Sequence, residues 1–236
     1  MTGQRNFHSS SNATTTAAPP SAQQDYGSYI LATGHGIVAR IELIVGSYFY
    51  QTRFKGLDPI LDLAPGRCWF TKQSPDTIVA VDNSEQVVRL YSSQGLRIRL
   101  GDAYALPFGE NYFQGVFCCW LFEHLADPFR AIRELHRVLQ PGGYACVIVP
   151  TPHDLLHFYD DCTHVRPFTE VSLAQLATAA GFSRYQTTYL PWARGIGQIL
   201  RAAGERWASA YLNFADKYLR SLGIVRKNNL MLESWK

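Results

Sequence analysis

Short apolar runs alternate with amphipathic segments along most of the chain. Ile60–Ala64, Ile78–Asp82 and Phe113–Cys119 are too short and too continuously apolar for surface helices. They are typical of parallel strands that are buried on both faces of a sheet. Leu96–Leu100 alternates apolar and basic residues, which indicates a strand nearer the edge, and Tyr144–Val149 predicts a further strand.

Helix signals separate these strands. The first predicted helix begins at Asn83 or Ser84, and the second begins at Asp127 and is stopped by Pro141–Gly143. A third is predicted between Thr169 and Gly181. Repeated strand–helix–strand units imply a parallel, doubly wound α/β sheet. Ligands of such sheets bind at the carboxyl ends of the strands, where the strand order reverses.

The two ends of the chain differ from this central region. Residues 1–25 are rich in Ser, Thr, Ala and Gln, which predicts a disordered tail and not a secretory signal. The rest predicts one domain, 26–236. Within it we expect N-terminal helices (26–55), a ligand-binding core (56–190), a helical insertion (191–227) and a final strand (228–236), which pairs antiparallel with Tyr185–Leu190.

Composition narrows the class of protein. The chain has 236 residues, of which 47% are apolar and 17% charged, with a net charge of +3. These values fit one globular domain and give no reason to expect nucleic acid as a partner. No segment has the roughly 18 apolar residues of a membrane span. The five cysteines form no CxxC pair, so we expect reduced thiols in the cytoplasm.

The predicted helical insertion carries an amphipathic and basic pattern. Ile196, Leu200, Trp207 and Tyr211 recur at helical spacing, and residues 193–227 hold seven Arg and Lys against two acids. Core packing or a dimer face is the interpretation we favour. A membrane-surface helix or a groove for a lipid substrate is the alternative.

Three aspartates follow three predicted strands. Asp62 and Asp82 are 20 residues apart, which is typical of a nucleoside-binding strand–helix–strand unit, where the second carboxylate binds ribose hydroxyls. Asp102 follows the third strand beside Ala103 and other small and apolar residues, a combination that suits an adenine ring. Asp62 could instead belong to an ordinary strand–helix turn, and Asp82 or Asn83 could be a helix cap.

These motifs occur in a characteristic order. Asp62 and Gly66 are followed by Val81-Asp82, Gly101-Asp102-Ala103, Phe122-Glu123-His124-Leu125 and Arg137 with Pro141-Gly142-Gly143. Over roughly residues 56–190 the chain resembles the class I S-adenosylmethionine-dependent methyltransferases, of the small-molecule type that resembles quinone-biosynthesis methyltransferases. The resemblance implies a Rossmann-like, doubly wound sheet of seven strands, mostly parallel, with N-terminal helices and a helical insertion before the last strand.

The resemblance also implies roles for single residues. It places S-adenosylmethionine against Asp62, Ala64, Gly66, Asp82, Asn83, Asp102, Ala103 and Cys119, and the acceptor beside Trp120. The first loop departs from the family pattern, because its three glycine positions are Ala64, Gly66 and Cys68. The Cys68 side chain is expected to crowd the cofactor and weaken its binding.

A polar loop follows the predicted fifth strand. Residues 152–168 include three His and three Asp, which suggests a cap over the substrate that carries a general base. A polar surface loop and a metal site are the alternatives, and we expect no metal. The catalytic candidates are His164, His124 and Asp161, although His124 could equally be a buried histidine bonded to backbone. With Trp120, the substrate-binding candidates are His157, Tyr159 and Arg166.

The expected reaction is methyl transfer from S-adenosylmethionine to a small-molecule acceptor, sugar- or lipid-linked and methylated at oxygen. One alternative is a catalytically silent relative that acts as a partner subunit, because the first loop is altered. The other is a nicotinamide-dependent oxidoreductase, which the absence of a Gly-x-Gly-x-x-Gly turn disfavours. The chain could form an oligomer under any of these three functions.

Overall fold

A seven-stranded sheet forms the centre of the protein. The computed structural model describes residues 36–154, 158–190, 196–219 and 228–236. The strand order is β3-β2-β1-β4-β5-β7-β6, and only β7 runs antiparallel to its neighbours. The strands are β1 (Ile60–Leu63), β2 (Ile78–Asp82), β3 (Ile98–Leu100), β4 (Phe113–Cys119), β5 (Leu139–Pro150), β6 (Arg184–Tyr189) and β7 (Asn229–Trp235). The expected fold class, a mostly parallel Rossmann-like sheet, is confirmed.

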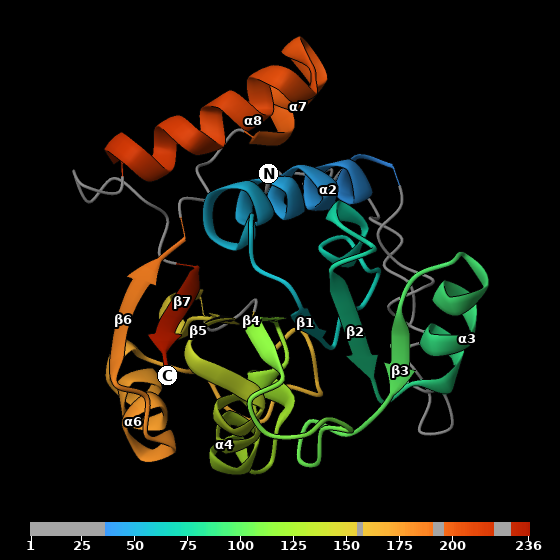
Figure 1. Cartoon of the computed structure of the whole chain (residues 1–236). Coiled ribbons are helices and arrows are strands. Elements are labelled where there is room, and N and C mark those ends of the chain that lie inside the picture. The colour runs from blue at the N-terminus through green and yellow to red at the C-terminus, as the bar shows by residue number, and fades with distance from the viewer. Residues whose placement is uncertain (1–35, 155–157, 191–195, 220–227) are drawn as a thin grey trace, which may run out of the picture.

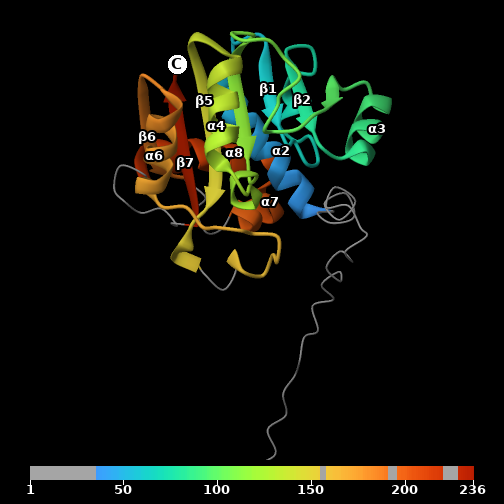
Figure 2. The same ribbon diagram turned by 90° about the horizontal axis from the view of Figure 1, so that it is seen from below.

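Helices cover both faces of the sheet. Figure 1 shows α4 and α6 below the strands and α2, α7 and α8 above them, and Figure 2 shows the same two layers from below. Buried residues form a core on each face. The α-helices are α2 (Ile37–Phe49), α3 (Glu85–Ser93), α4 (Pro128–Val138), α6 (Glu170–Ala180), α7 (Ile196–Ala203) and α8 (Glu205–Phe214). Helix α8 packs on α2, and both belong to the layer above the sheet.

Shorter helical segments join these elements. Two π-helical turns, η1 (Tyr50–Phe54) and η5 (Ala215–Leu219), extend α2 and α8. Three 3₁₀ turns follow strands or loops: η2 (Thr71–Gln73), η3 (Phe122–His124) and η4 (Pro152–Asp154). No helix among the described residues has both the length and the apolar character needed to cross a membrane.

Capping side chains set several helix ends where the sequence predicts them. The Ser84 side chain accepts a hydrogen bond from Val87 N, and Asp127 does the same for Arg130 N. Thr169 forms a capping box at the start of α6. Gly181 ends α6 in the left-handed conformation, with φ 88°, where glycine carries no steric penalty.

One predicted boundary is wrong. Helix α4 ends at Val138, before the Pro141–Gly143 stop signal, because Leu139 is already extended and pairs with Phe113 of β4. Residues 140–143 then form an irregularity at the start of β5, and regular pairing resumes at Tyr144. Gly142 permits this bend because its φ is +78°. The Pro-Gly-Gly string therefore shapes a strand instead of ending a helix.

The strand order reverses between β1 and β4. From β1 the chain moves outward to β2 and β3, and then returns to β4 on the other side. At this reversal the loops after neighbouring strands turn to opposite sides and leave a crevice. The predicted disordered tail, residues 1–25, lies outside the described residues, as do parts of the segments 26–55 and 191–227.

Candidate active site

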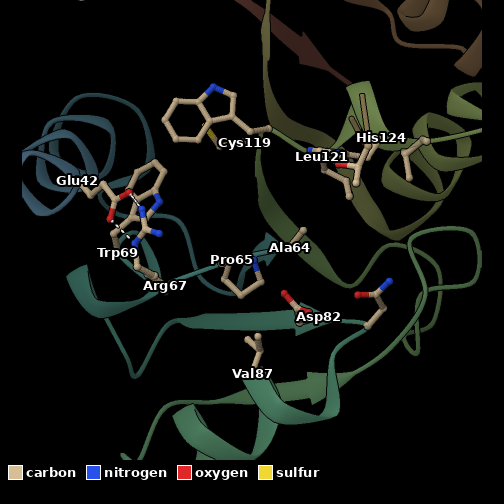
Figure 3. Close-up of a pocket in the computed structure, with 15 residues that line it drawn as sticks. Glu42, Ala64, Pro65, Arg67, Trp69, Asp82, Val87, Cys119, Leu121 and His124 are labelled. Carbon is tan, nitrogen blue, oxygen red and sulfur yellow. Dashed lines mark hydrogen bonds and ion pairs between the residues drawn. The ribbon is translucent and has the colours of Figure 1, made fainter. Parts of the chain in front are cut away.

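A cavity of about 380 Å³ lies at the carboxyl ends of β1, β2 and β4 (Figure 3). The loops after these three strands form most of its wall, and α2 and the loop before α6 complete it. The lining residues are Glu42, Ala64, Pro65, Gly66, Arg67, Trp69, Asp82, Asn83, Val87, Cys119, Trp120, Leu121, His124, Leu125 and Thr163. Of the predicted site residues, the cavity brings together Ala64, Gly66, Asp82, Asn83, Cys119, Trp120 and His124.

The loop after β1 adopts a conformation that suits glycine. Ala64, Gly66 and Cys68 have φ values of 55°, 52° and 55°, so all three are left-handed. A left-handed backbone costs an L-residue roughly 1–2 kcal/mol. The loop thus keeps the left-handed backbone that favours glycine, although Ala64 and Cys68 occupy two of the three positions.

Cys68 does not crowd the cavity, contrary to expectation. Its side chain is fully buried behind the loop, in a cluster with Val87 and Tyr91. Burial raises the pKa of its thiol, which stays neutral. Cys68 therefore contributes packing beneath the loop, and its side chain is not among the described groups that line the cavity.

We expect Ala64→Gly to raise the free energy of unfolding by about 1 kcal/mol, because glycine relieves the left-handed backbone of Ala64. Cys68→Gly relieves the same strain but removes a buried side chain, so it is expected to destabilise the protein. Urea unfolding of both variants measures the two effects. A lower stability for Ala64→Gly would show that its backbone is not strained.

Asp62 supports the loop from below. It is buried, and its Oδ2 accepts hydrogen bonds from Thr71 N (3.1 Å) and Thr71 Oγ1 (2.6 Å). Burial raises the pKa of Asp62 to about 7, and the two bonds from Thr71 act in the opposite direction. Asp62 thus holds the far end of the loop, at Thr71, against β1. It is not among the described residues that line the cavity.

The acids after β2 and β3 have different positions. Asp82 lines the cavity, is 9% exposed, and its Oδ1 accepts a hydrogen bond from Ser84 N at 2.9 Å. Asp102 is exposed and accepts a hydrogen bond from Tyr104 N, while Ala103 packs against the core. The described lining includes neither Asp102 nor Ala103, so their predicted adenine contact stays a prediction.

Glu42 and Arg67 form an ion pair in the cavity wall, which the sequence did not indicate. Arg67 Nε donates to Glu42 Oε2 at 2.9 Å, and Arg67 Nη2 contacts Glu42 Oε1, so the pair is bidentate (Figure 3). The side chain of Arg67 is only 20% exposed, and that of Glu42 is only 8% exposed. The sequence indicates this ion pair only weakly, because Glu42 is a single acid in an apolar helix and Arg67 lies 25 residues away.

Cys119 and Trp120 lie where β4 ends. Burial, with the nearby Glu123 carboxylate, raises the pKa of the Cys119 thiol, so it stays neutral. Trp120 has a left-handed backbone with φ 58°, and its Nε1 donates to Asn229 Oδ1 at 3.0 Å. A bulky residue in this conformation is held by its surroundings. Here the bond to Asn229 orients the indole at the cavity wall.

Two histidines meet beside this end of the cavity. Thr163 Oγ1 donates to Asp161 Oδ1 at 2.6 Å and lies 2.9 Å from His124 Nδ1. We assign the hydroxyl proton to the bond with Asp161, because a carboxylate can only accept; this assignment puts a proton on His124 Nδ1 and a lone pair on Nε2. His164 Nδ1 lies 2.7 Å from the carbonyl oxygen of Phe158, which can only accept, so His164 has the same tautomer.

Burial shifts the pKa values of two titratable groups in this region, His124 and Glu123. Burial lowers the pKa of His124, and the nearby His164 lowers it further. Burial raises the pKa of Glu123 to about 8, with a smaller contribution from the Asp161 carboxylate. The ring centroids of His124 and His164 are 4.8 Å apart. The predicted catalytic residues His124, His164 and Asp161 therefore form one group, of which His124 faces the cavity.

The remaining substrate candidates are not part of this group. Tyr159 is 61% exposed, and Arg166 Nη2 donates to the carbonyl oxygen of Ala126 at 2.8 Å. Neither residue is among the described residues that line the cavity. His157 falls outside the described residues. Thr163, which the sequence analysis left out, does line the cavity and links His124 to Asp161.

Comparison with known proteins identifies the family. Residues 61–147 match a family model described as "Methyltransferase domain", and this stretch contains β2 to β4 and most of β1 and β5. This stretch of the chain is a methyltransferase domain, and the similarities below support the class I S-adenosylmethionine-dependent type. The crystal structure of a SAM dependent methyltransferase from Archaeoglobus fulgidus has the same fold, with a TM-score of 0.60 and 17% identity over 83% of this chain and 94% of that one.

Several curated relatives are named as methyltransferases of quinone compounds. The demethylmenaquinone methyltransferase of Symbiobacterium thermophilum is 34% identical over 117 residues, which are 43% of this chain and 47% of the relative. The chloroplastic 2-methyl-6-phytyl-1,4-hydroquinone methyltransferase of Spinacia oleracea is 32% identical over 130 residues, 52% of this chain and 38% of the relative. The matches thus span less than half the length of these relatives.

Proposed function

We propose that this methyltransferase transfers the methyl group of S-adenosylmethionine to an oxygen of a small-molecule acceptor. The observation that carries the proposal is the cavity at the strand-order reversal, where Asp82 and the left-handed loop after β1 face one space. A carboxylate at the end of the second strand is suited to the two hydroxyls of a ribose. Asn83 and Val87 lie beside Asp82 in the lining and would contact the adenine.

The ion pair between Glu42 and Arg67 gives the cofactor a direction. The methionine part of S-adenosylmethionine is a zwitterion, with one ammonium and one carboxylate. Arg67 can donate to the carboxylate, and Glu42 can accept from the ammonium. Figure 3 shows this pair on the opposite side of the cavity from Asp82. The cofactor would therefore extend from Asp82 to Arg67, with its sulfonium near Ala64 and Cys119 between them.

Arg67→Ala is expected to weaken binding of S-adenosylhomocysteine at least about tenfold, because a charge-assisted bond is lost and Glu42 remains buried without this partner. Calorimetry measures the affinity. Binding of 5′-methylthioadenosine, which lacks the amino-acid part, should change little. Arg89→Ala is the matched control, since Arg89 pairs with Glu85 on the exposed surface of α3. Equal losses for both ligands would contradict the proposed direction.

The acceptor would enter at Trp120 and His124. Methyl transfer is an in-line displacement at the sulfonium, and the protein contributes by orienting the acceptor and excluding water. A hydroxyl acceptor has to lose its proton, and the two histidines and Asp161 are the groups at that end of the cavity that can assist. Trp120 offers a flat apolar surface, which suits a ring such as a quinol or a sugar attached to a lipid.

Two measurements test the function as a whole. Calorimetry with S-adenosylmethionine and S-adenosylhomocysteine tests cofactor binding, and we expect saturable binding of both. Incubation with labelled S-adenosylmethionine and extracts, followed by mass spectrometry, identifies the methylated product. Fragmentation of that product distinguishes methylation at oxygen from methylation at carbon. An absence of binding to either cofactor form would favour the silent relative, and the family assignment leaves the nicotinamide-dependent reaction without support.

A further inference from the structure

We propose that Glu123, His124 and His164 bind a divalent transition-metal ion beside the acceptor end of the cavity. A carboxylate oxygen of Glu123 and one ring nitrogen of each histidine all lie within 4.8 Å of one another. Glu123 and His124 belong to η3, which begins three residues after the end of β4, and His164 belongs to the loop before α6. The fold thus brings together ligands from two segments that are distant in sequence. The contact between Thr163 and His124, which are 39 residues apart, holds the same two segments together.

The buried carboxylate of Glu123 is the first argument for an ion. Glu123 is 1% exposed, and its Oε2 has no hydrogen-bond partner among the described residues. A buried polar atom without a partner is unfavourable, and most such atoms in proteins are paired. A cation at this position would pair with Oε2. The carboxylate of Asp161 adds negative charge nearby, with its Oδ2 4.0 Å from His164 Nε2.

The tautomers of the two histidines are the second argument. His164 donates its Nδ1 proton to the Phe158 carbonyl, and the Nδ1 proton of His124 goes to Thr163, which in turn donates to Asp161. In metal sites the ligating histidine usually donates its other ring N–H to a carbonyl, a carboxylate or a similar partner, which fixes the ring. With these tautomers, the nitrogen that each ring offers to an ion is Nε2.

The donor set indicates the kind of ion. Two imidazole nitrogens and one carboxylate oxygen fit Zn²⁺ and the non-haem Fe²⁺ type of site better than Mg²⁺ or Ca²⁺, which prefer oxygen ligands. Three protein ligands leave at least one coordination position open. The sequence analysis considered a metal site only within residues 152–168 and expected none; the sequence does not show that Glu123 and His164 meet.

The position of His124 gives the ion a role, and this part rests on the proposed methyl transfer. His124 lines the cavity, so the open coordination position would be within reach of an acceptor oxygen. An ion there would orient that oxygen and lower the pKa of a hydroxyl. It would then replace the imidazole of His124 as the group that assists loss of the proton. The favoured acceptors are molecules with a hydroxyl on a ring, where a neighbouring oxygen can also bind the ion.

Metal titration of the full chain tests the site without any need for activity. Metal-free protein is titrated with Zn²⁺ by calorimetry and with Co²⁺ by visible absorption. We expect one ion per chain and a Co²⁺ spectrum of nitrogen and oxygen ligation. Glu123→Gln and His164→Ala should each weaken Zn²⁺ binding by more than about 100-fold, because each removes a direct ligand, whereas loss of an outer partner alone costs 10–100-fold. His153→Ala is the control, since His153 is exposed and contacts Tyr189.

Thermal unfolding of the metal-free variants checks that they are folded. No saturable binding to the wild-type protein, or equal binding in wild type, Glu123→Gln and His164→Ala, would overturn the proposal. Binding of S-adenosylhomocysteine is measured on the same samples. Zn²⁺ binding without cofactor binding would support the metal site and refute the proposed function. Cofactor binding without Zn²⁺ binding would refute the metal site and leave the proposed function supported.

Discussion

Replacement of His124 by alanine is expected to lower turnover on an identified acceptor by about 10²–10⁴-fold. His124 is the member of the histidine group that lines the cavity, and its Nε2 lone pair is set by the contact of Nδ1 with Thr163. The loss is expected whether the lone pair takes the proton of the acceptor or holds an ion that lowers its pKa. Affinity for S-adenosylhomocysteine should stay within about twofold, because the proposed polar contacts to the cofactor lie on α2 and on the loops after β1 and β2.

Companion variants separate these two roles of His124. If the imidazole is the base, His164→Ala should reduce turnover far less than His124→Ala. If both histidines bind the ion, the two variants should lose similar activity, and added Zn²⁺ should restore wild-type activity after chelation. Thr163→Val tests positioning, since it keeps the shape of the side chain but removes the contacts to His124 and Asp161. Normal turnover in both histidine variants would show that proximity alone drives the transfer.

Asp82→Ala is expected to weaken S-adenosylhomocysteine binding by roughly 1.5–3 kcal/mol, which is about 10–150-fold. Two charge-assisted bonds to the ribose would be lost. Calorimetry measures the change. Because Asp82 Oδ1 also accepts from Ser84 N at the start of α3, Asp82→Asn is the conservative companion that keeps an acceptor there. It should bind more tightly than Asp82→Ala but less tightly than the wild-type protein.

Asp102→Ala completes this series. Asp102 is an exposed acid after the neighbouring strand, and the described cavity lining does not include it. From the structure we expect less than a threefold effect on affinity. A loss as large as that of Asp82→Ala would restore the adenine contact expected from the sequence. Unchanged affinity in the Asp82 variants would remove Asp82 from the cofactor site.

The amino-acid sequence by itself determined the layers of the fold and the edge of the sheet where ligands bind. Short apolar runs such as residues 78–81 are typical of strands covered on both faces, and their parallel order follows from the helices between them. The positions of Asp82 and Trp120 at strand ends follow in turn. These inferences succeeded because they depend on local patterning and on a general rule of topology.

Only the tertiary structure decided which polar side chains meet. Asp62 turns into the core to bind Thr71, and Asp102 turns out to solvent, although both follow the same local pattern as Asp82. Glu42 reaches Arg67 because α2 packs over the first loop, and His124 reaches Thr163 across 39 residues of chain. The direction of a side chain depends on the elements packed against it, and those lie far away in the sequence.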